Sequence, residues 1–455
     1  MLLKRKIRVA FSAILFCNMA NAQTNLEAVD YYEALKVIES VDYQIADTPV
    51  VAIIDNGVNI MHEDLRGNIW RNHSEIPANG IDDDGNGFVD DLHGWNFSSN
   101  SNDVTAGGSG NWHGTPVNGI IGASCGNSVG VRGICPAVRL MNIVKGDSIG
   151  SHIESLKYVY TMRDLYNQTD GEQGAFVVAV NCSWGLDSLW ASDYPQWCGM
   201  YDLLGSVGVL CVNSVPNDDI DVDAFGDMPT TCQSDYLITV TNSNKKGRKI
   251  KDAAYGVVSV DLAAPGDNTF TTLNNGHYGH FGGTSAAAPY VSGTVALLYL
   301  LPSDDFQQSV RANPAETALA VKSAILGSVD KNESLDGITV SGGQLNIFES
   351  VKMLCDNYEA QSIYEKTLFE PLKIVSVSPN PAKSHISIQL ECDEDAEMVL
   401  NITDLWGRVF HEENISVSKG INSMPIELAH LIDGLYIINI HSRFSTQRTK
   451  LIINS

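Results

Sequence analysis

The stretch Val50-Val51-Ala52-Ile53-Ile54-Asp55-Asn56-Gly57 decides the fold class of this chain. Its first five residues are apolar without a break, and the run ends at an acidic residue and a glycine. A short, fully apolar run of this kind predicts a strand buried on both faces, as in a parallel sheet. The acidic residue then stands at the carboxyl end of the strand, where the active sites of α/β proteins lie.

Four further apolar runs repeat this pattern, and helix-like stretches such as residues 151–165 lie between them. The runs are residues 140–144, 176–180, 207–212 and 237–240. Strands and helices in alternation predict an α/β domain with a parallel sheet flanked by helices. We expect its active site at the carboxyl ends of the strands.

The hydrophobicity pattern of the sequence changes after about Tyr358. Short segments of alternating polar and apolar residues, separated by turn residues, occur at 386–390, 399–402 and 436–440. This alternation predicts a small C-terminal antiparallel β-sandwich. The expected organisation is a signal peptide at 1–22, an α/β domain at 23–357, a linker at 358–371 and the β-sandwich at 372–455.

The first 22 residues have the three-part layout of a secretory signal peptide. A basic start with Lys4, Arg5, Lys6 and Arg8 precedes an apolar stretch at 9–16, and Ala20-Asn21-Ala22 offers small residues for cleavage. The alternative, a membrane anchor, needs about 20 apolar residues, which neither this stretch nor a later one supplies. We therefore expect an exported protein with no membrane span.

The chain is strongly acidic. It has 54 acidic and 29 basic side chains, which give a formal net charge of −25. Removal of the signal peptide takes away four basic residues and makes the chain still more acidic. Such a charge argues against nucleic acid or an anionic membrane as a partner, and it favours the binding of cations.

Nine cysteines are present, and Cys17 would leave with the signal peptide. Export permits disulfides, and the remaining eight cysteines allow roughly a hundred pairings. We expect the pairs Cys125–Cys135 and Cys198–Cys232. Cys211 lies within an apolar run, which favours a buried free thiol.

Three short motifs follow one another in the order Asp, His, Ser. They are Asp55-Asn56-Gly57-Val58, His113-Gly114-Thr115-Pro116 and Gly282-Gly283-Thr284-Ser285-Ala286-Ala287-Ala288-Pro289. A carboxylate held at a strand end can accept an imidazole N–H and stabilise the protonated ring. A serine that enters a helix has a backbone N–H at the positive end of the helix, where an oxyanion can bind.

Each motif alone is more typical of a turn, a loop or close helix packing, but the three together indicate nucleophilic catalysis. Together they resemble the subtilisin-like (S8) serine peptidases, which have this order of motifs. GTSAAAP at 283–289 differs by one residue from the common family form GTSMAAP. HGTPVNG at 113–119 stands where the family usually has HGTHVAG.

The resemblance covers roughly residues 49–350 and implies a subtilisin-like serine endopeptidase that acts on proteins or peptides. It assigns Asp55, His113 and Ser285 to a catalytic triad. Asn217 is implied to donate to the oxyanion, with Asn213 as the alternative. Two edges would hold the substrate backbone as a β-strand: Ser148, Ile149 and Gly150 on one, and Ser183, Trp184 and Gly185 on the other. A catalytically silent binding protein of the same fold is the alternative function.

Residues 82–90 resemble the first nine positions of an EF-hand loop. The resemblance implies Ca²⁺ ligands from Asp82, Asp84, Asn86, the carbonyl of Phe88, and Asp90. Position twelve is His93 rather than glutamate, so the closing ligand would come from elsewhere, for example Asp91. Because many carboxylates in a short loop repel one another, we expect a structural Ca²⁺ site rather than the alternative, a solvated acidic turn.

The last 80 or so residues carry Ser378-Pro379-Asn380-Pro381, alternating strands, and the ending Thr449-Lys450-Leu451-Ile452-Ile453. This pattern resembles the C-terminal sorting domain of type IX secretion cargo. It implies the type IX machinery as a partner and delivery through the periplasm of a Gram-negative bacterium to the medium or the cell surface. The alternative is a β-sandwich that binds carbohydrate or protein.

Overall fold

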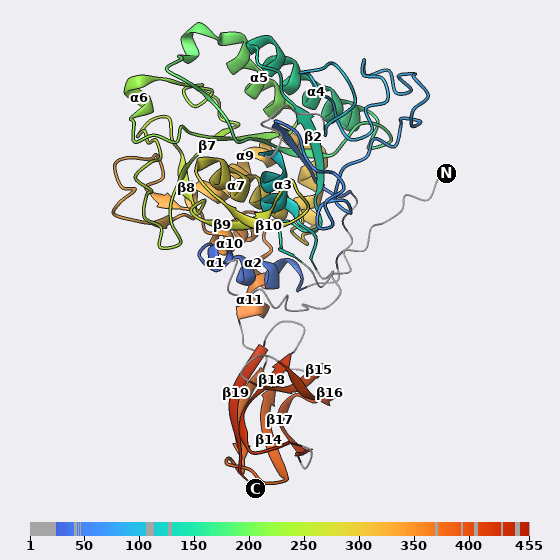
Figure 1. Ribbon diagram of the computed structural model, residues 1–455, viewed down its shortest axis with the longest axis vertical. Coiled ribbons are helices and arrows are strands. Elements are labelled where there is room, and N and C mark those ends of the chain that lie inside the picture. The colour runs from blue at the N-terminus through green and yellow to red at the C-terminus, as the bar shows by residue number, and fades with distance from the viewer. Residues whose placement is uncertain are drawn as a thin grey trace. The chain divides into compact units, whose positions relative to one another are not determined.

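The computed structural model describes residues 24–454, except for 41–42, 44, 46, 106–112, 126–129, 369–371, 393–394, 405–407, 429–430 and 442–445. The predicted signal peptide and Cys17 lie outside the described residues. The chain divides into two compact units between Gln361 and Ser362 (Figure 1).

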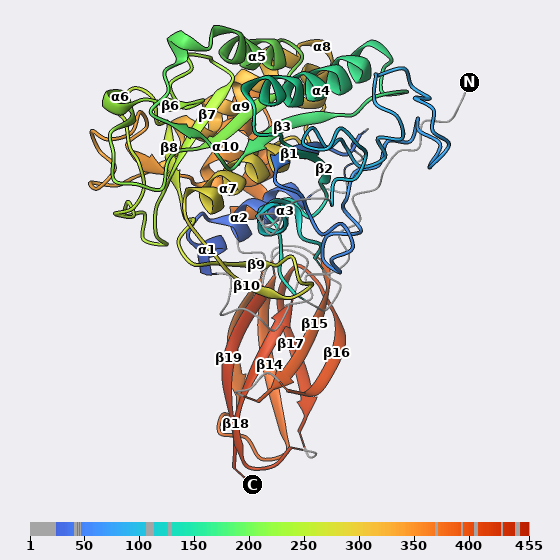
Figure 2. The same ribbon diagram turned by 45° about the horizontal axis from the view of Figure 1, so that its top comes forward.

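The first unit is built on an eight-stranded sheet with the strand order β11-β12-β8-β7-β5-β3-β1-β2 (Figure 2). In chain order the strands are β1 Val50–Asp55, β2 Arg139–Val144, β3 Val177–Cys182, β5 Leu210–Ser214, β7 Leu237–Asn242, β8 Leu262–Ala264, β11 Asp330–Lys331 and β12 Gly343–Gln344. Neighbouring strands are parallel except for the β11–β12 pair. All six residues of β1, β3 and β7 are buried, which confirms the expected parallel sheet.

Helices cover both faces of this sheet (Figure 2). Helices α3 Gly114–Gly122 and α7 Thr284–Leu298 pack on one face, and α4 Ile149–Gln168 and α5 Pro195–Ser206 pack on the other. The apolar run at 207–212 becomes a strand only at Leu210, because Val207 caps α5 and Gly208 turns the chain with a φ of 92°. That left-handed conformation suits a residue without a side chain.

The first unit contains further helices, a 3-10 turn and two short ribbons. They are α1 Thr24–Glu27, α2 Tyr31–Ile38, α6 Val222–Phe225, α8 Asp304–Ala312, α9 Pro314–Gly327, α10 Ile347–Asn357 and a 3-10 turn at Ala191–Asp193. Two antiparallel ribbons accompany them: β4 Leu186–Asp187 with β6 Asp227–Met228, and β9 Thr269–Thr272 with β10 Tyr278–Phe281. Helix α2 packs against α10, and Val29 and Tyr31 are fully buried, so residues 24–38 belong to the core of this unit.

The second unit is an antiparallel β-sandwich, as expected from the alternating segments. One sheet has the order β13-β14-β17 and the other β16-β15-β18-β19. The strands are β13 Leu372–Ser378, β14 His385–Cys392, β15 Ala396–Thr403, β16 Val409–Val417, β17 Gly420–Glu427, β18 Gly434–His441 and β19 Thr446–Ile453. In β14 every second residue is buried, including Ile386, Ile388 and Leu390, which join one apolar core. The segment expected to be a linker contains helix α11 Gln361–Leu368.

One of the two expected disulfides is present. Cys198 and Cys232 are bonded, with their Cα atoms 5.3 Å apart, which confirms that pair. The pair Cys125–Cys135 was wrong, because both thiols are free. A disulfide needs side chains that face each other at short range, and spacing along the chain does not determine that. Cys211 is a buried free thiol, as predicted.

No helix in the described part of the chain is both long enough and apolar enough to cross a membrane.

Candidate active site

Asp55 and His113 form a hydrogen-bonded pair at the carboxyl end of β1. Asp55 is the last residue of β1 and is 3% exposed, and His113 immediately precedes α3. The Nδ1 atom of His113 lies 2.9 and 3.0 Å from the two carboxylate oxygens of Asp55. The N–H of Asn56 also donates to Asp55, at 2.7 Å. Because a carboxylate accepts the proton of Nδ1, the neutral ring keeps Nε2 as its proton acceptor.

The surroundings of His113 set its basicity. Burial acts to lower the pKa of the imidazole, whereas the charge of Asp55 and its hydrogen bond raise it, and Lys145 lowers it. The net effect is a pKa above the ordinary 6.5. The ring also packs edge-on against Phe281, with ring centres 5.3 Å apart. His113 is therefore a positioned base that takes up a proton more readily than a free histidine.

Ser285 lies in the first turn of α7, and every other side chain of that helix is buried. Its hydroxyl donates to the carbonyl oxygen of Ser183 at 3.1 Å. The hydroxyl of Ser183 in turn donates to the carbonyl oxygen of Ser285 at 3.0 Å. In a regular helix that carbonyl would accept from residue 289, which is a proline without an N–H. The bond from Ser183 thus replaces the missing helical one and fixes α7 to the end of β3.

Asn217 lies beside the start of α7 with its amide group oriented by Thr284. Its Oδ1 accepts the backbone N–H of Thr284 at 2.9 Å and the Thr284 hydroxyl at 3.1 Å. A backbone N–H can only donate, so the atom of Asn217 that faces it must be the oxygen. Asn217 is an exposed residue, and its Nδ2 is left to donate to another group.

Asn213 has a different environment from Asn217. It is 1% exposed, and its Nδ2 donates to the carbonyl oxygens of Trp184 and Ser214. Its donor atoms are therefore used within the fold, which favours Asn217 over Asn213 as a donor to a bound molecule.

The two segments predicted as substrate edges have different backbone structures. Ser183, Trp184 and Gly185 follow directly after β3, beside Ser285. The opposite edge strand was wrong at Ser148, Ile149 and Gly150. Ser148 caps α4 by accepting the N–H of Ser151 with its side chain, and Ile149 and Gly150 lie in the first turn of that helix. Their N–H groups belong to a helix start, so this segment is not a strand edge.

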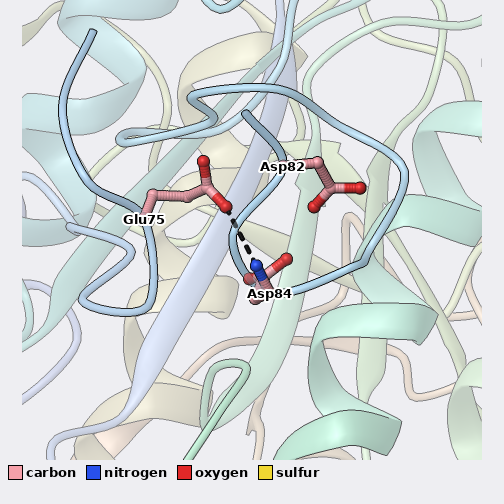
Figure 3. A group of neighbouring side chains, drawn as sticks. All are labelled: Glu75, Asp82 and Asp84. Atoms are coloured by element: carbon pink, nitrogen blue, oxygen red, sulfur yellow. Dashed lines mark hydrogen bonds between the residues drawn. The ribbon is translucent and has the colours of Figure 1, made fainter. Parts of the chain in front are cut away.

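The acidic loop gathers three carboxylates, but not the predicted set. Oxygens of Glu75, Asp82 and Asp84 lie within 4.8 Å of one another (Figure 3). Burial raises the pKa of Asp84, and the charge of Asp82 adds to that increase. Glu75 lies before the loop motif, and no local pattern in the sequence marks it as a neighbour.

Two predicted ligands of this loop make hydrogen bonds within it. Asp90 has a φ of 56°, and its carboxylate accepts the N–H groups of Asn79 and Gly80. The Oδ1 of Asn86 accepts the N–H of Phe88. The alternative ligand Asp91 is fully buried, and its carboxylate accepts hydrogen bonds from the side chains of Tyr158, Asn72 and Asn86. The carboxylates of Asp90 and Asp91 are thus held by local hydrogen bonds, and neither belongs to the cluster of Glu75, Asp82 and Asp84.

The Asp–His pair at the end of β1 and Ser285 at the start of α7 are the residue types that the class of serine hydrolases uses. Residues 46–338 match the model of the subtilase family, peptidase S8. This match covers more than half of the chain, and the chain belongs to the subtilase family. Residues 376–454 match the model of the secretion system C-terminal sorting domain, which confirms the type IX sorting domain.

Curated relatives include proteases of distant organisms. Subtilisin-like protease 1 of Plasmodium berghei is 27% identical over 355 residues, which cover 73% of this chain and 54% of that protein. The major intracellular serine protease of Bacillus subtilis is 27% identical over 260 residues, which cover 57% of this chain and 71% of that protein. The chain spans about half the length of the Plasmodium relatives that it matches.

Solved structures share the fold. The subtilase cytotoxin structure gives a TM-score of 0.52 at 20% identity, over 74% of this chain and 99% of that one. The epidermin leader peptide processing serine protease of Staphylococcus aureus gives 0.51 at 20% identity, over 76% and 83%. The subtilisin-like fold is therefore confirmed.

Proposed function

We propose that this protein is a secreted serine endopeptidase with Ser285 as nucleophile, His113 as general base and Asp55 as the residue that orients His113. The observation that carries the proposal is the paired contact of His113 Nδ1 with both oxygens of the buried Asp55 carboxylate. It leaves Nε2 to take the proton of Ser285 when the hydroxyl turns away from the Ser183 carbonyl. The serine oxygen then attacks the peptide carbonyl, and the protonated ring is stabilised by the negative charge of Asp55.

The oxyanion of the tetrahedral intermediate would be bound by two donors. One is the N–H of Ser285 at the positive end of α7, and the other is Nδ2 of Asn217, whose oxygen is held by Thr284. His113 then gives its proton to the leaving amine, and water hydrolyses the acyl-enzyme by the same steps. The backbone of residues 183–185 would hold the substrate as an added strand.

A serine-directed fluorophosphonate probe tests this proposal. An activated Ser285 should be labelled at a rate that rises as His113 loses its proton, whereas Ser285→Ala should give no adduct. The alternative is a catalytically silent binding protein of the same fold. An intact, folded protein that takes up no probe and cleaves no peptide would favour that alternative.

We further propose that Glu75, Asp82 and Asp84 hold a structural Ca²⁺ ion. Three carboxylates within 4.8 Å offer the oxygen ligands that Ca²⁺ prefers, and a cation would offset their mutual repulsion. A bound ion stabilises the native state because the unfolded chain lacks the site.

Removal of Ca²⁺ is expected to lower the melting temperature. At a hundredfold excess over the dissociation constant the ion contributes about 2.7 kcal/mol, or roughly 4 °C for a unit of more than about 300 residues. Asp84→Ala should melt at the same temperature with and without chelator. Asp90→Ala is the matched control, because Asp90 lies outside the cluster, and it should keep the response to chelator. A wild-type melting curve unchanged by chelator, measured by calorimetry, would indicate a solvated acidic turn.

We also propose that the second unit addresses the protein to the type IX machinery, through the periplasm of a Gram-negative bacterium. The match of residues 376–454 to a sorting domain supports this route. The unit has its own apolar core and supplies none of the proposed catalytic residues.

A chain that ends at Gln361 is expected to fold and to cleave peptides as the full chain does, because each unit has a separate core. In the native host the same truncation should leave the enzyme inside the cell envelope. Peptide turnover in vitro and fractionation of the host culture check the two outcomes. If the shortened enzyme reached the medium normally but lost activity on proteins, the second unit would be a substrate-binding module instead.

A further inference from the structure

Asp227, the first residue of β6, is a buried carboxylate that the proposed mechanism does not use. It is 0% exposed. One of its oxygens, Oδ2, accepts a hydrogen bond from the hydroxyl of Thr230. The other, Oδ1, has no hydrogen-bond partner in the described part of the chain. Burial of a polar atom without a hydrogen-bond partner costs free energy of folding, so such an atom in a native structure needs an explanation.

The position of Asp227 connects it with the proposed substrate edge. Strand β6 pairs with β4 so that Asp187 and Asp227 lie opposite each other. A Cβ atom placed on Gly185 would lie 3.0 Å from Oδ1 and 3.3 Å from Oδ2 of Asp227. The carboxylate therefore lies directly against the backbone of Gly185, on the side where any other residue would project a side chain.

Gly185 in turn lies close to the nucleophile. Ser183, two residues earlier, accepts the hydrogen bond of the Ser285 hydroxyl. Two residues of extended chain span about 7 Å. A lysine or arginine side chain is long enough to cover such a distance while its aliphatic stem contacts the wall of the site. Because Gly185 has no side chain, no Cβ atom crowds Oδ1 of this buried carboxylate.

The electrostatic surroundings favour a cation at this place. Burial raises the pKa of Asp227 to about 7, and the charge of Asp187 adds to the increase. The loop between Asn217 and Asp227 also carries four further carboxylates: Asp218, Asp219, Asp221 and Asp223. A concentration of one sign of charge attracts ligands of the opposite sign. A carboxylate at the inner end of such a region is suited to a positively charged side chain.

We propose that Asp227 is a specificity-determining residue that selects substrates with arginine or lysine at the position that supplies the scissile carbonyl. The inference rests on the proposed peptidase function and names its substrate class. The cationic head of the substrate side chain supplies Oδ1 with the donor that the fold lacks. A charge-assisted hydrogen bond in a buried site is stronger than one between neutral groups. Substrates with a cationic side chain at this position are therefore preferred over neutral ones.

The test compares peptides that are identical except at this position, with arginine in one and citrulline in the other. Citrulline keeps the shape and length of arginine but has no charge. The wild-type kcat/KM is expected to be about 100-fold higher, or more, for the arginine peptide. In Asp227→Asn the ratio of the two kcat/KM values should fall to within a few-fold of one. Active-site titration with fluorophosphonate normalises each preparation and confirms that each variant is folded.

Asp187→Asn is the matched control. It removes the same charge from the residue opposite Asp227, but from an exposed side chain. The arginine-to-citrulline ratio should stay near the wild-type value in this variant. If Asp227→Asn fails to fold, the wild-type ratio decides alone. A wild-type ratio near one, with both peptides cleaved, would overturn this inference and leave the proposed peptidase intact. Failure of both cleavage and labelling would instead overturn the peptidase proposal.

Discussion

Replacement of Ser285 by alanine is expected to abolish peptide hydrolysis. The nucleophilic oxygen is the atom that forms the acyl-enzyme, and the hydroxyl of the neighbouring Thr284 is bonded to the Val215 carbonyl and Asn217. In a subtilisin, a relative of this chain, loss of the nucleophile lowers kcat by about 2 × 10⁶. We expect a loss of roughly the same size, measured as kcat on a chromogenic peptide at neutral pH.

The matched control is Ser292→Ala, which removes the same group from the same helix. Ser292 is buried seven residues further along α7 and donates to the side chain of Asn181 at 2.8 Å. Its loss should cost about 1 kcal/mol of stability and change kcat little. Near-wild-type turnover in Ser285→Ala, after exclusion of contaminating proteases, would refute the assignment of the nucleophile.

Replacement of Asp55 by asparagine is expected to lower kcat by about 10⁴, the loss seen when the aspartate of another serine protease triad is changed in this way. Asparagine occupies the same volume, so the fold should persist. Its amide can donate to Nδ1 of His113, which turns the ring into the wrong tautomer, and it supplies no charge for the protonated ring. Asp147→Asn, which removes an exposed carboxylate shortly after β2, is the control and should change kcat little.

The same substitution is expected to change the pH profile. His113 acts as a base only when it is neutral, and its pKa lies above 6.5 because Asp55 outweighs burial. Wild-type kcat/KM should therefore fall as the pH drops through a value above 6.5. Without the charge of Asp55 the lowering by burial remains, so the residual activity of Asp55→Asn should fall at a lower pH. A profile that does not move would argue against the pairing of these two residues.

The proposed triad could be predicted from short-range sequence patterns, because each of its members stands at the boundary of one helix or strand. Asp55 ends an apolar strand, His113 precedes a helix, and Ser285 opens a helix of small residues. Each boundary is marked by residues that are adjacent in the sequence. Parallel strands with intervening helices then bring such boundaries to one edge of the sheet. The geometry of Asp55 and His113 follows from that rule.

Other features depend on contacts between distant segments. The edge strand expected at Ser148 is a helix cap, because its side chain satisfies an N–H of α4. In the acidic loop the left-handed conformation of Asp90 turns its carboxylate to Asn79 and Gly80, and Glu75 takes a place in the cluster instead. The spacing of ligands in an EF-hand sequence predicts a metal site only if the loop adopts the EF-hand conformation.

The sequence by itself determined the subtilase fold, the C-terminal sandwich and the residues proposed for chemistry, since hydrophobic periodicity and element boundaries are local properties. Only the tertiary structure decided which cysteines pair, which carboxylates gather and where Asp227 lies. Nothing near Asp227 in the sequence separates it from the other acidic residues of its loop. Its position against Gly185 arises from the pairing of β4 with β6, two strands far apart along the chain. Such a contact is determined by how the whole chain packs, and packing is a property of all its parts together.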